Sequence, residues 1–354
     1  MQAIGCVGWE ASGHAKPTPW RLILGMVGLA GTFGIDRPLS AMQLEPDSSG
    51  FVTGGGGTRV YFEIHGKGRD TVIVPGGMLL APHFSPLRDD FTLVFYDPRG
   101  RGKSDWVGDA SRLTMADEVR DLETVRSALR IGRAALVGFS YLGLVAALYA
   151  ADHPAQVTRL VLIGPMAPDH ETSSRYAPPE RKARTDSAAA RFSRSRAGVD
   201  TTDFAAECRR WHDAFGPVYV GDPSDASRIT TEFCVHQNES PSRFLWRTDQ
   251  TIRSLGRRWD YGRKASAIRV PTLVIQGDRD LAASPDGARR WAELIPDARL
   301  IMLSGAGHLT YIERRDRVIP ALGRFLSGSW PGEAMQLRSR TSGVGKRTAV
   351  VAGG

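Results

Sequence analysis

Cysteine is scarce in this sequence, and its spacing argues against two kinds of architecture. The 354 residues contain three cysteines, and no two of them form a C-x-x-C pair. This spacing argues against a zinc site and against a disulfide framework. Cys208 and Cys234 could pair if the protein is exported, and are ordinary thiols otherwise. The 42% hydrophobic content can instead bury a large core, which excludes a chain that is disordered throughout.

The sequence also lacks a hydrophobic run long enough to cross a bilayer. The apolar stretch at residues 22–35 is too short for a membrane span. It follows Arg21 and ends near small residues, as a secretory signal does, but Glu10 dilutes the positive charge of a long upstream region. We therefore expect a cytoplasmic protein without stable membrane insertion. Alternatively, residues 1–41 act as a signal and the protein is secreted, or they form a disordered extension and translation begins at Met42.

No recognisable nucleic-acid-binding module is present, although the formal net charge is +8. Much of the arginine lies in two stretches, residues 181–196 and 338–346. We interpret both stretches as solvated or flexible, and we expect no nucleic-acid partner. A nucleic-acid site would instead predict an affinity that falls steeply with salt.

Short apolar segments recur along the chain and predict the strands of a sheet. They are bounded by Gly, Pro or Asp, and such runs suit strands that helices cover on both faces. The expected strands are residues 58–64, 71–74, 92–96, 135–138, 160–163, 272–276 and 300–303, and the expected helices are residues 115–129, 141–151, 288–294 and 317–326. This alternation predicts an α/β fold with a doubly wound, mostly parallel sheet.

The alternation of strands and helices is interrupted once. Arg, Ser and Asp become frequent between residues 169 and 266, where aromatic residues are scattered among helical patterns, and the alternation resumes at Val270. We expect this insertion to form a mostly helical cap over the carboxyl edge of the sheet. The expected organisation is an extension at 1–50, a core at 51–168, the cap at 169–266, a second part of the core at 267–328, and a flexible tail at 329–354.

The helix expected at residues 115–129 has recognisable ends. Thr114 can cap its start together with Asp117, three residues later, and Gly132 can close its end. The helix expected at residues 141–151 is apolar nearly all round, so it should be buried against its strand.

A serine follows the expected strand at residues 135–138 and directly precedes this buried helix. Ser140 occupies the apex of Gly138-Phe139-Ser140-Tyr141-Leu142-Gly143, in the strand, turn and helix context that a nucleophile elbow requires. Here the chain resembles the α/β-hydrolase family, over residues 58–168 and 270–326. The family motif G-x-S-x-G places Gly two residues after Ser, where this sequence has Leu142. The resemblance implies that Ser140 is a catalytic nucleophile; the alternative is a serine that caps a helix.

The acid and the histidine that such a serine needs follow in the order of the family. Asp280 lies after the strand at residues 272–276 and resembles the family's triad acid; Asp278 is the nearer alternative and Asp169 the remoter one. His308 lies in a glycine-rich loop after the last expected strand, where the resemblance implies the general base.

Two backbone N–H groups are expected to stabilise an oxyanion. The loop at residues 75–78 resembles the family's His-Gly-x loop, with Pro75 in place of the histidine. By position, the N–H groups of Gly77 and Tyr141 should form the oxyanion hole. His83 follows this loop and could border the pocket. Residues 97–105 resemble a further family signature, for which we expect a structural role.

The resemblance implies a serine hydrolase that cleaves a small-molecule ester or amide through an acyl-enzyme, with neither a metal nor another cofactor. Proline-specific aminopeptidases share this triad; their substrate ammonium needs carboxylates, which Glu232 and Glu239 could supply. A non-catalytic ligand-binding protein of the same fold is the alternative of another class. Substrate identity and oligomeric state remain open at this stage.

Overall fold

The structure is a computed structural model that describes residues 45–195, 203–229, 234, 238 and 240–337. The signal-like stretch, the start at Met42, the basic residues at 338–346, and Glu232 and Glu239 all lie outside the described residues. Among the residues that are described, no helix combines the length and hydrophobicity that a membrane span requires.

In the described part of the chain, eight strands form one sheet in the order β1-β2-β4-β3-β5-β6-β7-β8. Their bounds are β1 Ser48–Thr53, β2 Arg59–His65, β3 Asp70–Pro75, β4 Phe91–Tyr96, β5 Ala134–Phe139, β6 Val157–Ile163, β7 Thr272–Gly277 and β8 Ala298–Leu303. β2 is antiparallel to β1 and β4, and the pairs from β4 to β8 are parallel. The predicted α/β fold with a mostly parallel sheet is confirmed.

The edge strand β1 was not predicted. It starts at Ser48, inside the range expected for the extension, and pairs with β2 from Ser48 opposite Ile64 to Thr53 opposite Arg59. Ser, Gly and Thr give this strand little hydrophobic alternation, so its pairing with β2, rather than its own sequence pattern, defines it.

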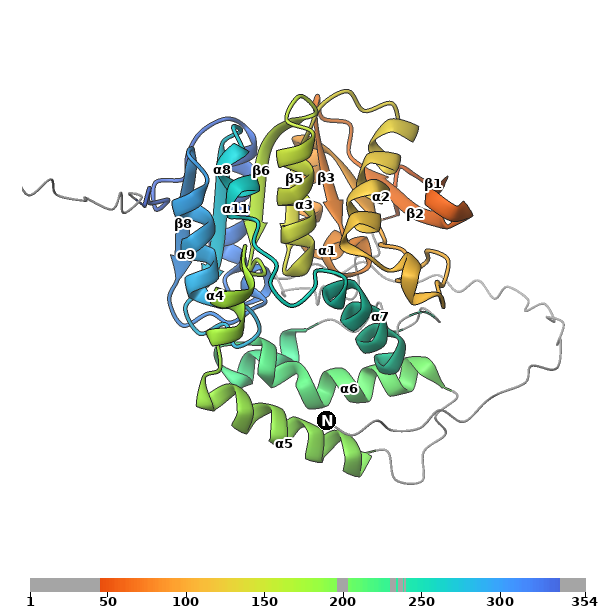
Figure 1. The fold of residues 1–354 in the computed structure, drawn as a ribbon, viewed down its shortest axis with the longest axis vertical. Helices are drawn as coiled ribbons and strands as arrows, with labels where there is room; N and C mark the ends of the chain where they lie inside the picture. The colour runs from red at the N-terminus through yellow and green to blue at the C-terminus, as the bar shows by residue number, and fades with distance from the viewer. Residues whose placement is uncertain (1–44, 196–202, 230–233, 235–237, 239, 338–354) are drawn as a thin grey trace, which may run out of the picture. The chain divides into compact units, whose positions relative to one another are not determined.

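Helices cover both faces of the sheet (Figure 1). One face carries α2 Met115–Ala128, α3 Tyr141–Asp152, α8 Gly262–Ala267 and α9 Pro285–Leu294, and the other carries α1 Gly77–Phe84, α10 Thr310–Glu313 and α11 Arg315–Leu326. Successive strand residues enter opposite layers, as Val72 and Val74 pack on one side and Ile73 on the other. Both faces are therefore buried, as the continuous apolar runs predict.

The ends of α2 show one confirmed prediction and one error. Thr114 and Asp117 form the predicted capping box, in which each side chain bonds the other residue's backbone N–H. The prediction that Gly132 closes the helix is wrong. Arg130 adopts a left-handed φ of 54° instead. The N–H of Ile131 then reaches the carbonyl of Arg126 at 2.9 Å, so the chain turns two residues before the glycine.

The remaining helices lie between β6 and β7. They are α4 His170–Arg175, α5 Pro179–Ser195, α6 Phe204–Tyr219 and α7 Pro241–Arg253, and we call them the inserted helices. All but the last residue of α8 also falls within residues 169–266, but Ala265 is buried in the same core cluster as α3 and α9. The structure thus places α8 with the helices of the sheet.

The basic stretch at residues 181–196 is part of α5 as far as Ser195 rather than a flexible segment. Arg184 donates to the carbonyls of Pro217 and Val220, both at 2.8 Å, and Arg191 donates to the carbonyl of Ala214 at 2.6 Å. These arginines therefore fasten α5 to α6, a role that the charge pattern did not indicate.

An acidic side chain on β2 gives the fold a pH-sensitive contact. Glu63 accepts hydrogen bonds from Tyr61 at 2.9 Å and Lys103 at 3.0 Å, and lies 3.3 Å from His65 Nε2. Burial raises the pKa of Glu63, but the hydrogen bonds and charges of these neighbours outweigh burial and lower it from 4.5 to about 2.

We therefore expect Glu63→Gln to reduce the free energy of unfolding at pH 6 by about 1–2 kcal/mol, since the side chain is partly screened by solvent. A lowered carboxylate pKa stabilises the fold above the unfolded value, and this contribution disappears as pH falls from about 4.5 toward 2. Urea unfolding of both proteins at pH values of about 6, 5, 4 and 3.5 should show that the difference in their free energies of unfolding becomes smaller as the pH falls. A difference that stays constant or grows as pH falls would contradict this assignment.

Candidate active site

Ser140 lies at a sharp turn between β5 and α3. Its φ of 56° and ψ of −128° fall in a region that non-glycine residues rarely adopt, at a cost of about 1–3 kcal/mol. The turn brings strand and helix together: a Cβ on Gly138 would stand 2.5 Å from the carbonyl oxygen of Leu142 and 2.7 Å from the Cα of Gly143. Glycine is therefore required at position 138, and Ser140 is presented at the amino end of α3.

Leu142 stands where the motif G-x-S-x-G has its second glycine, and the geometry accommodates it. The other close approach lies one residue later, where a Cβ on Gly143 would be 3.2 Å from the Cβ of Pro165. The Leu142 side chain is buried and packs toward Gly76 in the loop after β3. The departure from the motif therefore leaves the turn intact.

Asp280 and His308 lie together after neighbouring strands. Asp280 follows β7, His308 follows β8, and Asp280 Oδ2 is 2.7 Å from His308 Nδ1. Their side chains are 0% and 4% exposed, respectively. When Nδ1–H donates to a carboxylate, Nε2 is the basic nitrogen of the imidazole. The pair is thus arranged to accept a proton at Nε2.

The Asp280 carboxylate is oriented by further donors. Its Oδ1 accepts from the N–H groups of Ala282 and Ala283, both at 2.8 Å, and its Oδ2 accepts from Gln276 Nε2 at 2.9 Å. Gln276 is fully buried at the end of β7, and sequence reasoning missed it. A buried Gln in an otherwise apolar strand was the available signal, because such a group needs partners.

The two alternative acids occupy other positions. Asp278 Oδ1 accepts from the N–H of Gly305 at 2.7 Å, which ties together the two loops after β7 and β8. Asp169 caps α4 by accepting from the N–H of Thr172 at 2.7 Å. Both carboxylates therefore accept from backbone N–H groups, whereas Asp280 is the carboxylate that accepts from His308 Nδ1.

The loop that carries His308 is fixed by a second residue that the sequence did not reveal. Glu313 Oε2 accepts from the N–H of Gly307 at 2.8 Å, and its Oε1 accepts from the N–H of Gly221 at 2.7 Å. The N–H of His308 itself donates to the carbonyl of Tyr219, at the end of α6, at 2.8 Å. Burial raises the pKa of Glu313, while the two N–H bonds act in the opposite direction. The inserted helices thus contact the histidine loop directly.

Ser140 and His308 line the same cavity. Within the described part of the chain, no hydrogen bond joins the Ser140 hydroxyl to the imidazole; such bonds often form only when substrate is present. The imidazole packs on the ring of Phe139 at a centroid distance of 4.7 Å. A Cβ on Gly164 would stand 3.1 Å from His308 Nδ1, so the absence of a side chain there gives the imidazole room beside the elbow.

The expected oxyanion residues both begin helices. Tyr141 is the first residue of α3 and lines the cavity. Gly77 is the first residue of α1 and is buried, but among the described residues the cavity wall contains Met78 rather than Gly77. The N–H of Met78 is bonded to Asp97 Oδ1 at 2.9 Å. N–H groups in the first turn of a helix point beyond its end and carry positive charge, which suits an oxyanion.

The cavity has a volume of about 560 Å³, within the range typical of small-molecule sites. Its wall is mostly apolar and aromatic and draws on both the sheet edge and the inserted helices, including Leu79, Phe139, Trp211, Tyr219, Phe244 and Ile252. Arg101, Arg181 and Asp249 are the charged groups among the described lining residues, apart from histidines. The cavity thus offers a large apolar surface beside Ser140.

Two further histidines line this cavity, and both are neutral at pH 7. Burial, followed by the charge of Arg315, lowers the pKa of His83 to about 4. Burial, followed by the charge of Arg101, lowers the pKa of His212 to about 4. The expectation that His83 borders the pocket is confirmed.

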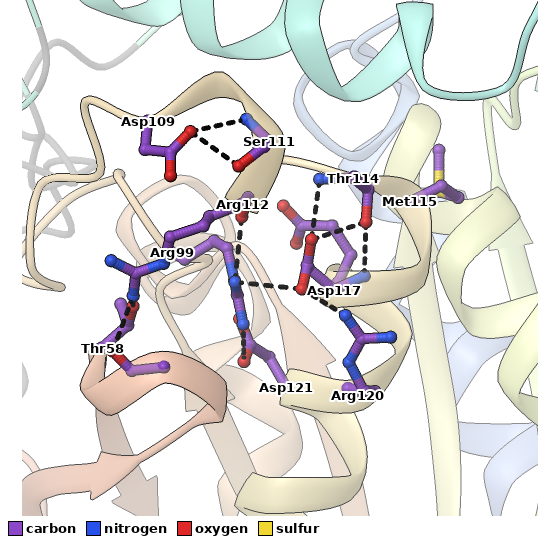
Figure 2. Close-up of polar contacts among 12 residues, drawn as sticks. Thr58, Arg99, Asp109, Ser111, Arg112, Thr114, Met115, Asp117, Arg120 and Asp121 are labelled. Atoms are coloured by element: carbon purple, nitrogen blue, oxygen red, sulfur yellow. Dashed lines mark hydrogen bonds and ion pairs between the residues drawn. The ribbon is translucent and has the colours of Figure 1, made fainter.

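Arg99, within the signature at residues 97–105, has the structural role that we expected (Figure 2), whereas Arg101 of the same stretch lines the cavity. Arg99 is 1% exposed, and its guanidinium donates two bonds of 2.6 Å to Asp121 and one of 2.9 Å to the carbonyl of Arg112. Asp117 lies 3.3 Å from Arg99 as well. The network joins the loop after β4 to α2, behind the elbow.

Arg247 on α7 connects the inserted helices to this network. It is fully buried and donates from Nε to the carbonyl of Arg99 at 2.9 Å, from Nη2 to Glu118, and from Nη1 to the hydroxyl of Tyr141. The pattern of α7 does not distinguish Arg247 from the surface arginines around it. Its partners are 106 to 148 residues away in sequence, so local periodicity could not identify it.

Comparisons with known proteins agree with this geometry. The family model described as the alpha/beta hydrolase fold matches residues 58–315. A proline iminopeptidase of Pestalotiopsis fici is 25% identical over 240 residues, covering 67% of this chain and 82% of that protein. A putative carbamate hydrolase of a Caulobacter species is 29% identical over 283 residues, covering 76% and 96%.

Solved structures show the same fold. An esterase of Exiguobacterium antarcticum superposes with a TM-score of 0.59 at 20% identity, covering 78% of this chain and 98% of the esterase. An enol-lactonase of Burkholderia xenovorans gives a TM-score of 0.57 at 25% identity, covering 78% and 100%. The strand order, the elbow and these likenesses together lead to one conclusion: the chain belongs to the α/β-hydrolase family and is a hydrolase.

Proposed function

We propose that this protein is a serine hydrolase that cleaves a carboxylic ester or amide of a small molecule through an acyl-enzyme intermediate. The observation that carries the proposal is the buried pair of Asp280 and His308, 2.7 Å apart, of which His308 lines the same cavity as Ser140. In this order of nucleophile, acid and base, each group has a defined role.

The chemistry proceeds in two steps. His308 Nε2 removes the hydroxyl proton as Ser140 Oγ attacks the substrate carbonyl, and the N–H groups of Gly77 and Tyr141 stabilise the oxyanion. The imidazolium returns the proton to the leaving group, and a water activated by His308 then releases the acyl group. Asp280 holds the imidazole in the required tautomer and stabilises its positive charge. Neither step needs a metal or another cofactor. We also propose that the inserted helices act as the cap that shapes substrate selectivity.

Aminopeptidase activity is the second candidate, because a relative is named as a proline iminopeptidase. A substrate ammonium needs a carboxylate near the scissile bond. Among the described residues of the cavity wall, Asp249 is the one carboxylate; it is exposed and already pairs with Arg253 at 2.6 Å. The apolar wall therefore favours, as substrate, an ester with an apolar acyl group over a peptide with a free amino terminus.

A panel of p-nitrophenyl esters of increasing acyl length, measured beside a prolyl arylamide, tests the proposal. Each methylene that enters the cavity contributes about 0.8 kcal/mol, so kcat/KM should rise by about fourfold per methylene until the cavity is filled. A prolyl arylamide that exceeds every ester would select the aminopeptidase. A wild-type protein that hydrolyses nothing in the panel and is not labelled by a fluorophosphonate would select the non-catalytic binding protein.

A further inference from the structure

Two cysteines and a histidine from the part of the chain between β6 and β7 lie together beside the cavity. Cys208 and Cys234 form a disulfide with Cα atoms 5.4 Å apart. His212 follows Cys208 by four residues on α6, so the two side chains lie on one face of the helix, one turn apart. The sulfur atoms and a ring nitrogen of His212 all lie within 4.8 Å of one another.

This spacing is close to that of ligands around one zinc ion. Zinc bonds of about 2.3 Å to sulfur and about 2.0 Å to nitrogen, in tetrahedral geometry, place two thiolates about 3.8 Å apart and a thiolate and an imidazole about 3.5 Å apart. Thiolate and imidazole ligands favour zinc over magnesium or calcium, which prefer oxygen. The absence of a C-x-x-C pair argues only against ligands adjacent in sequence; Cys234 is 26 residues from Cys208 and the fold brings it to the same point.

We propose that Cys208, Cys234 and His212 bind one zinc ion when the disulfide is reduced. A dithiol or phosphine reductant supplies two electrons, the S–S bond breaks, and the two sulfurs become thiols. Zinc then displaces the two thiol protons and is held by two thiolates and the imidazole. The disulfide and the zinc site exclude each other, because the same sulfur electrons form either bond.

The position of the site connects it with the candidate active site. Cys208 and His212 line the cavity that contains Ser140 and His308. The two cysteines are 2% and 0% exposed and pack against Met78 and Leu79 of α1, directly after Gly77. Three protein ligands leave the fourth zinc position to water. The oxidised and zinc-bound states thus alter the wall of one cavity without altering the proposed triad.

The test uses the full-length protein, reduced with a phosphine without oxygen and titrated with Co²⁺ and then Zn²⁺. We expect about one Co²⁺ per chain, with the near-ultraviolet absorption of thiolate-bound cobalt, which Zn²⁺ displaces. Cys208→Ser and Cys234→Ser should abolish this absorption, and His212→Ala should weaken affinity by about 10-fold to 100-fold. Cys6→Ser is the matched control and should bind cobalt as the wild type does.

The oxidised protein supplies a second control, since it keeps its native sequence and should give no cobalt signal. Zinc should also raise the Tm of the reduced protein and leave that of the oxidised protein unchanged. The proposal is overturned if reduced wild type binds no more metal than the Cys208→Ser variant, if Cys6→Ser abolishes binding, or if zinc fails to raise the Tm of the reduced chain. None of these readouts requires hydrolase activity, so they remain independent of the proposed function.

Discussion

Replacing Ser140 with alanine should lower kcat/KM for an activated ester by about 10⁴-fold to 10⁶-fold, because it removes the hydroxyl that we propose forms the acyl-enzyme. Fluorophosphonate labelling should be lost at the same time. The unfolding midpoint should hold or rise, since the substitution removes no hydrogen bond of the Ser140 hydroxyl within the described residues and keeps the helix end. Ser127→Ala, an exposed serine on α2, is the matched control and should retain full activity.

Substitutions of the two neighbouring aspartates, Asp280 and Asp278, test which of them assists His308. Asp280→Asn should reduce kcat by about 10³-fold to 10⁴-fold, because an amide favours the wrong imidazole tautomer. Asp278→Asn should change kcat by less than about tenfold, since Asp278 bonds the N–H of Gly305 and not the imidazole. Steady-state kinetics on one ester decide the matter. Equal losses in the two variants, or a Ser140→Ala protein that is still labelled, would remove the proposed triad.

Replacing Arg247 with methionine should destabilise the fold by about 3–5 kcal/mol, because it leaves Glu118 as an unpaired charge in a fully buried position. Equilibrium urea unfolding measures the loss. The double variant Arg247→Met with Glu118→Leu should recover most of it, since a buried pair can be replaced by apolar groups at little cost.

A surface pair on the same helix provides the comparison. Arg253 lies 2.6 Å from Asp249, but its side chain is 73% exposed, so Arg253→Met should cost less than about 1 kcal/mol. Tyr141→Phe removes one acceptor of Arg247 and should cost less stability than Arg247→Met, because Arg247 and Glu118 remain paired. Equal destabilisation by Arg247→Met and Arg253→Met would contradict the role assigned to the buried pair.

Local sequence pattern was sufficient for β2 to β8 and for α2, α3, α9 and α11, because strand and helix periodicities depend on which face of each segment is buried. The short helices α1, α8 and α10 were not predicted. The capping box at Thr114 and the elbow around Ser140 were equally accessible, since both depend on residues within a few positions of one another. The order of Ser140, Asp280 and His308 came from the family resemblance, and the hydrogen bond between the last two agrees with it. The edge strand β1 was not predicted, because its pairing with β2, and not its own composition, defines it.

From its sequence, the chain could thus be assigned an α/β-hydrolase architecture, and the family resemblance located the residues that we propose as nucleophile, acid and base. The folded structure was needed to find that Gln276 bonds Asp280, that Glu313 holds the loop of His308, and that Arg247 joins the inserted helices to Tyr141. It also placed His212 beside two cysteines. Arg247 and the bond from Gly221 to Glu313 join groups 92 to 148 residues apart, and no local period records which distant partner a buried polar group will meet. Gln276 and Asp280 are only four residues apart, but they meet across an irregular turn after β7, where no strand or helix period applies.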